Sequence, residues 1–239
     1  MKLEERFKRH LLKTVGKKPT REEMTRINKQ FIRPAFKKIY DNPDKPPALI
    51  RSIYDRTLSG IWDKLVADQS SFSEILLLKK YIKSGKYSRI TSVASGLAVF
   101  ELFLAKEFFP DGKILCVDIS EGMNRRAEAY KKKLGAKNID IITASATKLP
   151  IKRNSQDIVL IRRSGMSNDR RWNIVLKEAR KVLKKKRNSR VIYTADADFT
   201  KPLVDIKTDL KRAKFKFVAS ERFRRGDGKL VEMIVAKCL

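Results

Sequence analysis

The first part of the chain carries apolar residues at the three- and four-residue steps of amphipathic helices. The clearest run begins with a capping box, Thr20–Glu23, and contains Pro34, which predicts a kink. Two further runs cover residues 49–65 and 71–83. We therefore predict an all-helical module over residues 1–85. The expected buried positions of the clearest run are Met24, Ile27, Phe31, Ala35 and Ile39.

After residue 85 the pattern changes to short β-branched and apolar segments that alternate with helical ones. This alternation predicts a parallel sheet with helices on both faces. Near the C-terminus, two strand-like segments flank the turn-forming stretch 224–228 without a helix between them, which predicts an antiparallel hairpin. The fold class is therefore α/β and Rossmann-like, over residues 86–239. The predicted strands are 90–94, 113–117, 139–143, 158–161, 191–194, 214–221 and 230–236.

Two features lie where such a sheet would bind a ligand. Gly96 follows the first predicted strand, and glycine allows the backbone to approach a ligand closely. Asp118 ends the second predicted strand, where a carboxylate can accept hydrogen bonds from ribose hydroxyls. Together they predict a nucleotide-like ligand at the carboxyl edge of the sheet.

Five short motifs in register resemble the class I S-adenosylmethionine-dependent methyltransferases. They are Arg89-Ile-Thr-Ser-Val-Ala-Ser-Gly96, Val117-Asp-Ile-Ser-Glu-Gly-Met123, Thr143-Ala-Ser-Ala-Thr-Lys-Leu-Pro150, Ser155-Gln-Asp-Ile-Val159 and Leu176-Lys-Glu-Ala-Arg-Lys-Val-Leu183. The resemblance implies a seven-stranded sheet and S-adenosyl-L-methionine as cofactor.

The resemblance also assigns cofactor-binding residues. The turn Ala94-Ser95-Gly96 would pass under the methionine part of the cofactor, and Asp118 would bind its ribose. Ile119 and Met123 would flank the adenine, although Met123 could equally be a core residue of its helix. Ser145 and Ala146 would lie at the adenine edge.

The sequence departs from the family pattern at several of these positions. Ser92 stands at the usual aspartate, Ala94 and Ala98 stand at usual glycines, and Ser145 replaces another aspartate. These changes would weaken cofactor binding or move it onto backbone amides. They keep open a second reading, a non-catalytic RNA-binding or ribosome-assembly factor on a degenerate methyltransferase fold.

The net charge of the chain indicates which kind of molecule would accept the methyl group. The 239 residues include 56 Lys and Arg against 27 Asp and Glu, a net charge of +29, while 42% of the residues are hydrophobic. That hydrophobic share excludes a disordered basic tail, and the absence of a long apolar run argues against a membrane protein. An excess of this size favours a polyanionic partner, most often nucleic acid. We expect RNA, and ribosomal RNA or the small ribosomal subunit in particular.

The numbers of cysteine and histidine residues limit the possible reaction mechanisms and the possible cellular location. Two cysteines are too few for a disulfide framework or a zinc site, so we expect no metal and a cytoplasmic location. The single histidine argues against a mechanism built on histidine. The N-terminus lacks the pattern of a signal peptide. We expect a monomer that does not associate with membranes.

Basic clusters are the candidate RNA contacts. The run Lys184-Lys185-Lys186-Arg187 and the pair Arg170-Arg171 are predicted to contact the RNA backbone. The alternative for the longer run is a solvated loop after a helix.

The segment after the predicted strand 158–161 is the candidate catalytic region. Ser164 and Asn168 could hydrogen-bond a base edge, and Arg162 or Arg163 could hold a phosphate or stack on the base. Cytosine carbon-5 methylation requires a cysteine nucleophile, and Cys116 lies inside a predicted strand. We therefore expect methylation of a base nitrogen.

The whole pattern resembles an archaeal ribosomal-RNA base methyltransferase, with the cytidine exocyclic amine as one candidate target. The remaining alternative is a protein-lysine methyltransferase, whose cationic substrates are disfavoured by the charge of +29.

Overall fold

The computed structural model describes residues 1–40, 47–58, 60–82, 87–162, 171–186, 188–197 and 202–239. No helix in these ranges is long and apolar enough to cross a membrane. The helices are α1 (Leu3–Thr14), α2 (Arg21–Ile27), η1 (Asn28–Ile32), α3 (Arg33–Tyr40), α4 (Pro47–Ser52), η2 (Ile53–Leu58), α5 (Trp62–Gln69), α6 (Phe72–Tyr81), α7 (Val99–Glu107), α8 (Glu121–Leu134), α9 (Trp172–Val182) and α10 (Leu203–Arg212). The strands are β1 (Arg89–Val93), β2 (Lys113–Asp118), β3 (Ile139–Thr143), β4 (Ile158–Arg162), β5 (Arg190–Asp196), β6 (Phe215–Arg224) and β7 (Leu230–Cys238).

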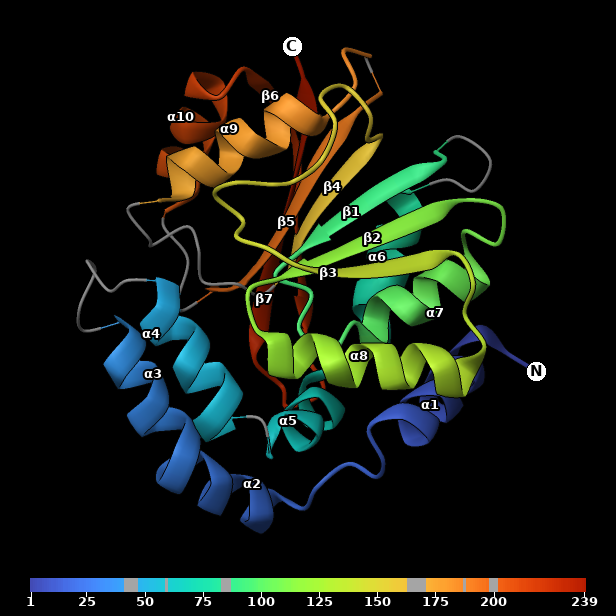
Figure 1. The fold of residues 1–239 in the computed structure, drawn as a ribbon, viewed down its shortest axis with the longest axis vertical. Helices are drawn as coiled ribbons and strands as arrows, with labels where there is room; N and C mark the ends of the chain where they lie inside the picture. Colours follow the sequence, from blue (N-terminus) through green and yellow to red (C-terminus); the bar gives the residue numbers. More distant parts are fainter. Residues whose placement is uncertain (41–46, 59, 83–86, 163–170, 187, 198–201) are drawn as a thin grey trace.

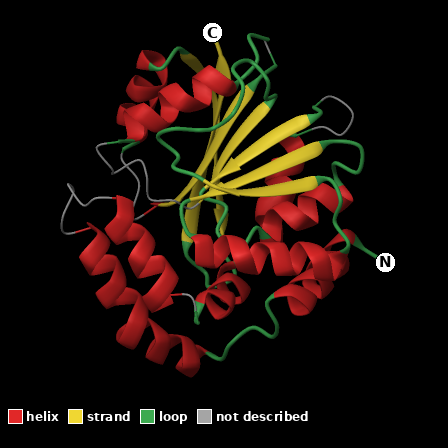
Figure 2. Ribbon diagram, in the orientation of Figure 1, coloured by secondary structure: helices red, strands yellow, loops and turns green. Residues whose placement is uncertain are grey.

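The strands form one seven-stranded sheet in the order β3-β2-β1-β4-β5-β7-β6 (Figures 1 and 2). Strands β1 to β5 are parallel, whereas β7 pairs antiparallel with both β5 and β6. The predicted α/β fold with a C-terminal antiparallel hairpin is therefore confirmed. The strand order reverses between β1 and β4, the place where ligands bind in open parallel sheets.

Both faces of the sheet are apolar because successive strand residues point to opposite sides. In β4, Ile158 and Leu160 pack with residues of α1, α6 and α7 on one face. Val159 and Ile161 pack with residues of α9 and α10 on the other. All four side chains are fully buried. The continuous apolar run of β4 is thus explained by burial on both sides.

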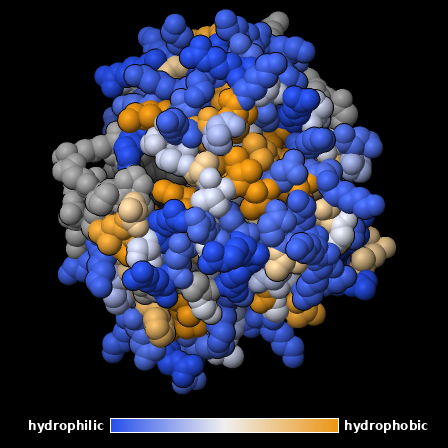
Figure 3. All heavy atoms as spheres, viewed as in Figure 1, coloured by the Kyte–Doolittle hydropathy of each residue, from blue (hydrophilic) through white to orange (hydrophobic). Residues whose placement is uncertain are grey.

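The connection from β3 to β4 departs from strict strand–helix alternation. Residues 144–157 form turns and irregular segments instead of a helix. Because no helix covers this connection, Leu115, Ile142 and Ile151 are only half-buried. They lie beside the cluster that contains Val159 and Ile161. Figure 3 shows apolar surface, in orange, in the middle of the face between α8 and α9.

The N-terminal helices do not all lie apart from the sheet. Phe7 of α1 and Ile75 and Leu78 of α6 belong to the same buried cluster as strands β1, β2 and β4. The helices from α2 to α5 instead lie along the edge of the sheet where β1 and β2 end (Figure 1). The boundary at residue 85 stays a prediction. Apolar side chains from before and after it pack together in one buried cluster.

A π-helical turn changes which residues of the clearest helical run are buried. Arg33 N–H donates to the carbonyl of Asn28, five residues earlier, immediately before Pro34. The extra residue in this turn buries Ile32 at 5% exposure and leaves Phe31 at 40%. The prediction of Phe31 as a buried position was therefore wrong. The reason is the helix interruption next to Pro34, which shifts the apolar face by one residue.

His10 fixes α1 to α7. Its Nε2 lies 2.6 Å from the carbonyl oxygen of Val99, and its ring packs against Phe103. The side chain is buried, and burial lowers the pKa of His10 despite the opposing hydrogen bond to Val99.

This burial predicts a pH-dependent stability. Because the folded pKa is lowered, the unfolded chain takes up a proton first as the pH falls below about 6.5, so the free energy of unfolding decreases there. The His10→Gln variant, which can still donate to Val99, should lose this dependence. Urea unfolding at several pH values measures it, and equal pH dependence of the two proteins would contradict the role of His10.

Candidate active site

Asp118, at the carboxyl end of β2, is hydrogen-bonded to the loop that follows β1. Gly96 N–H donates to Asp118 Oδ2 at 2.8 Å, and Ser120 N–H donates to Oδ1 at 2.9 Å. Burial raises the pKa of Asp118, and the neighbouring Asp55 adds to the rise, while these N–H donors act against it. A carboxylate has about four acceptor positions, so each oxygen can still accept a further hydroxyl.

In the loop after β1, two alanines adopt the left-handed backbone conformation that usually favours glycine. Ala94, Gly96 and Ala98 have φ angles of 56°, 55° and 52°, in the left-handed region. This conformation costs an alanine roughly 1–2 kcal/mol. The two alanines therefore preserve the turn expected of the usual glycines, at a cost in strain. Between them, Ser95 is buried.

Trp62 of α5 lies directly over this loop. A Cβ atom placed on Gly96 would come within 3.3 Å of Trp62 Nε1, so a side chain at this position would crowd the indole. Tyr54 packs edge-on against Trp62 with ring centroids 5.4 Å apart. Both aromatic residues border the cluster that contains buried Leu97. The helices η2 and α5 thus cover the loop.

Polar contacts hold the same helices against α8. Asp55 Oδ1 accepts hydrogen bonds from Gly122 N–H, at 2.9 Å, and from the Ser120 hydroxyl. These donors lie at the N-terminus of α8, where a carboxylate is favoured by the helix dipole. Further contacts along α8 are the ion pairs Arg51–Glu121 and Arg126–Asp63 and the hydrogen bond from Tyr130 to Asp63.

A buried ion cluster lies at the end of β4. Arg162 Nε and Nη2 donate to the two oxygens of Glu74 at 2.8 and 3.1 Å, and Nη1 lies 3.4 Å from Glu101 Oε1. The Ser92 hydroxyl also donates to Glu101 Oε1, at 2.7 Å. The Arg162 guanidinium stacks over Phe100 at 3.7 Å. Burial opposes its charge, but Glu74 and Glu101 outweigh burial and raise the pKa of Arg162.

This cluster changes the interpretation of two predicted positions. The guanidinium of Arg162 is occupied by two carboxylates and is not directed at a ligand, so its phosphate contact is not supported by this geometry. Ser92, which stands at the usual aspartate, hydrogen-bonds the carboxylate of Glu101 instead. An acid therefore lies beside β1 after all, supplied by α7.

The remaining predicted cofactor residues lie near Asp118 in different environments. Ile119 is half-exposed beside it, as a residue facing a ligand would be. Met123 is only 2% exposed and packs with Leu97 and Val99, which fits the core alternative. After β3, Ser145 Oγ lies 2.8 Å from the Thr147 hydroxyl, and Ala146 is half-buried.

Half of the predicted catalytic and RNA-binding residues cannot be placed. Arg163, Ser164, Asn168, Arg170 and Arg187 lie outside the described residues. Their roles stay predictions. Arg171 precedes α9 and is half-buried.

The lysine run after α9 lies at the opposite edge of the sheet from Asp118. Lys184 N–H donates to the carbonyl of Gln156, just before β4 begins, and Lys184 Nζ pairs with Asp157 at 2.7 Å. Lys185 and Lys186 are exposed. This run precedes β5 and so meets the amino ends of the strands, and its contact with the RNA backbone stays a prediction.

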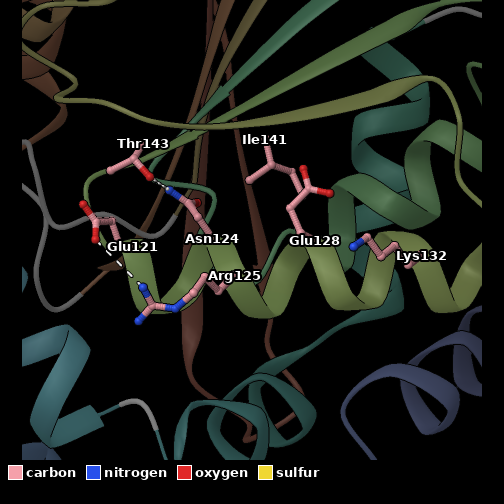
Figure 4. A pocket seen from close by; sticks show the side chains of 7 residues that line it. All are labelled: Glu121, Asn124, Arg125, Glu128, Lys132, Ile141 and Thr143. Atoms are coloured by element: carbon pink, nitrogen blue, oxygen red, sulfur yellow. Dashed lines mark hydrogen bonds and ion pairs between the residues drawn. The ribbon is translucent and has the colours of Figure 1, made fainter.

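A shallow groove runs along α8 beside the edge strand β3 (Figure 4). Asn124 Nδ2 donates to Thr143 Oγ1 across its upper end at 2.8 Å. The groove carries charges of both signs, and its position next to Glu121 makes it a neighbour of the Asp118 junction. Its lining residues are Glu121, Asn124, Arg125, Glu128, Lys132, Ile141 and Thr143.

Comparison with known proteins agrees with this geometry. Residues 90–186 match the family described as methyltransferase domain. The demethylmenaquinone methyltransferase of Lactococcus lactis is 27% identical over 163 residues, which are 68% of this chain and 58% of that protein. Its counterpart in Geobacillus stearothermophilus is 34% identical over 145 residues, 56% and 62% of the two chains. The chain thus spans less than two thirds of the length of these relatives.

Solved structures share the fold. An S-adenosylmethionine-dependent methyltransferase from Aquifex aeolicus superposes with a TM-score of 0.60 at 16% identity, covering 82% of this chain and all of that one. Another from Methanosarcina mazei gives 0.57 at 16% identity, covering 68% and 97%.

Residues 90–186 thus match a methyltransferase domain, and the sheet has the fold of S-adenosylmethionine-dependent methyltransferases of known structure. The predicted cofactor, S-adenosyl-L-methionine, is confirmed for this domain. These matches do not support the narrower resemblance to an archaeal ribosomal-RNA base methyltransferase, and the acceptor stays open.

The residues at the Asp118 junction fit this cofactor. Asp118 retains acceptor positions for ribose hydroxyls, and half-exposed Ile119 offers an apolar surface to an adenine. The backbone at Gly96 is left-handed, and Trp62 lies on the outer side of that turn.

Sequence reasoning missed the residues that come from outside the motifs. Trp62 and Asp55 reach the site from helices far along the chain, and no local pattern marks them. Glu101 did carry a signal, because it is a lone acid within the apolar run 99–105. Such an acid is expected to be buried and paired.

The Arg162 cluster generates a stability prediction. The Arg162→Met variant leaves two carboxylates buried without their cation and should lose about 3–5 kcal/mol of unfolding free energy. The triple variant Arg162→Met, Glu74→Gln, Glu101→Gln should recover part of the loss. Urea unfolding measures both, and a loss below about 1 kcal/mol in the single variant would show that the cluster is solvated.

The position of Trp62 generates a binding prediction. The chain has two tryptophans, and the Trp172→Phe variant leaves Trp62 as the only one. Titration with S-adenosylhomocysteine should then change the emission of Trp62 saturably. The Trp62→Phe variant, which retains buried Trp172, is the matched control and should show no change. Binding detected by calorimetry without any change at Trp62 would place the cofactor elsewhere.

Proposed function

We propose that this protein transfers a methyl group from S-adenosyl-L-methionine to a base nitrogen in structured RNA, with ribosomal RNA as the first candidate. The observation that carries the proposal is the net charge of +29 on a chain with an ordinary hydrophobic share. A surface with this excess attracts polyanions and repels cationic protein tails.

The chain's own residues have defined tasks in this reaction. When bound, the cofactor supplies an electrophilic methyl group on a sulfonium sulfur. Asp118 accepts hydrogen bonds from ribose hydroxyls, and the turn at Gly96 brings backbone amides close to the methionine part. The base nitrogen would take the methyl group of the cofactor, which would leave as the thioether, and the proton released from that nitrogen would pass to water. Positioning of the two reactants supplies most of such a rate enhancement.

Hydrogen bonds from Ser164 or Asn168 to the base edge belong to this proposal. The cytidine exocyclic amine is the candidate target, because its two hydrogens leave one for such a bond and one for loss. Both residues follow β4 in the sequence.

A second candidate acceptor is a small apolar molecule. The sequence matches to demethylmenaquinone methyltransferases favour it. The half-buried residues Leu115, Ile142 and Ile151, beside the helix-free connection from β3 to β4, would suit an apolar ring. The net charge does not favour this candidate, since a neutral lipid gains nothing from a cationic surface.

Label transfer separates the two candidates. The protein is incubated with methyl-tritiated S-adenosylmethionine and, in parallel, ribosomal RNA, total cell protein, or demethylmenaquinone in detergent. We expect label in RNA, at a position that nucleoside digestion assigns to a base. Label confined to the quinone or to protein would refute the RNA proposal.

The Asp118→Ala variant is the control for cofactor dependence. It loses a charged acceptor and should bind the cofactor more weakly by about 1–3 kcal/mol. Label transfer at low cofactor concentration should fall with it. Failure of the wild-type protein to bind S-adenosylmethionine in calorimetry would favour the non-catalytic alternative.

A further inference from the structure

We propose that one face of the continuous helix α2–η1–α3 binds the phosphate backbone of the RNA. Arg26, Lys29, Arg33 and Lys37, here called the basic row, are all exposed on this helix. The inference rests on the proposed RNA substrate and names the surface that would hold it.

The basic row is fixed outward by the packing of the opposite face. Met24, Ile27 and Ile32 are buried at 5–6% exposure against Leu65 and, at its margin, Trp62. The step from Ile27 to Ile32 spans five residues, which the π-helical turn accommodates. The same turn keeps the cations in register on the outside, so the row extends for roughly 16 Å at 1.5 Å per residue.

The charge of the row is not neutralised within the described part of the chain. No Asp or Glu occurs between Met24 and Tyr40. Among the described residues, none of the four cations of the row takes part in an ion pair, and Lys38 extends the exposed charge at its C-terminal end. Other cations differ in this respect, since Lys64 pairs with Glu23 and Lys184 with Asp157.

The location of the row favours a substrate contact. The helix packs on Trp62, and Trp62 lies over Gly96, so a single layer of side chains separates the row's helix from the cofactor loop. Figure 1 shows α2 and α3 on the side of the molecule where β1 and β2 end. The lysine run 184–186, by contrast, lies at the opposite edge of the sheet.

The buried apolar face argues against a membrane as the partner. A helix that binds a lipid surface inserts its apolar face, and here that face is packed against the protein. Phe31 is exposed on this helix, but one ring does not form an apolar strip, so the row of cations matches a phosphate backbone instead.

Salt-dependent binding of a fluorescein-labelled RNA hairpin tests the proposal. The row variant carries Arg26→Gln, Lys29→Gln, Arg33→Gln and Lys37→Gln in the full chain. The matched control carries Lys113→Gln, Lys137→Gln, Lys152→Gln and Arg153→Gln, four exposed basic residues at or before the amino ends of β2, β3 and β4. Both variants lose four charges, so a difference between them reports position and not total charge.

Loss of four phosphate contacts should reduce the slope of log affinity against log salt by about 3 in the row variant. The control should keep a slope close to that of the wild type. Equal losses in both variants would overturn the proposal, because binding would then follow net charge alone. Tight binding of the wild type to anionic phospholipid vesicles, abolished in the row variant while RNA binding is unchanged, would assign the row to a membrane.

Two readouts keep the result interpretable. Circular dichroism and affinity for S-adenosylhomocysteine should match the wild type in both variants, because all eight side chains are exposed and none of them bonds to Asp118. If RNA binds through the row but receives no label, the proposed function fails and the surface assignment stands. If RNA is labelled equally well by the row variant, the surface assignment fails and the function stands.

Discussion

A single buried arginine connects the two parts of the chain that the sequence pattern separates. Arg162 at the end of β4 binds Glu74 from the N-terminal helices and Glu101 from α7. Buried charges are tolerated only when they are paired. The position of α6 against the carboxyl edge of the sheet therefore depends on this cluster. The helices η2 and α5, which precede α6, make their own contacts with Gly96 and α8.

The helices η2 and α5 cover the cofactor loop and restrain its conformation. Asp55 binds the N-terminus of α8, and Trp62 lies on the turn at Gly96. Ala94 and Ala98 hold the loop in a conformation that glycine would adopt without strain. Packing from above and hydrogen bonding by Asp118 from the side supply the restraint that the strained turn requires. Contacts from Trp62 and Asp118, which lie outside the first motif, thus compensate for the strain of alanine at Ala94 and Ala98.

The strands, their order of appearance and the Gly96–Asp118 pairing could be predicted because they depend on local pattern. Period-two burial and a turn residue at a strand end are properties of a few neighbouring residues. Trp62, Asp55 and Glu74 could not be found in this way, since each acts on residues tens of positions away. The burial of Ile32 in place of Phe31 was missed because helical periodicity assumes an uninterrupted helix. The edge of the sheet at which the lysine run 184–186 lies could not be predicted, because charge alone carries no direction relative to the strands.

The central claim is that S-adenosylmethionine binds at the junction of Gly96 and Asp118, beneath the helices that carry Trp62. A crystal structure of the protein with S-adenosylhomocysteine tests it most directly. The account predicts ribose hydroxyls within hydrogen-bonding distance of the Asp118 carboxylate and the Trp62 indole against the homocysteine part. A ligand bound away from the carboxyl ends of β1 and β2, with the Asp118 carboxylate bonded only to backbone amides, would contradict it.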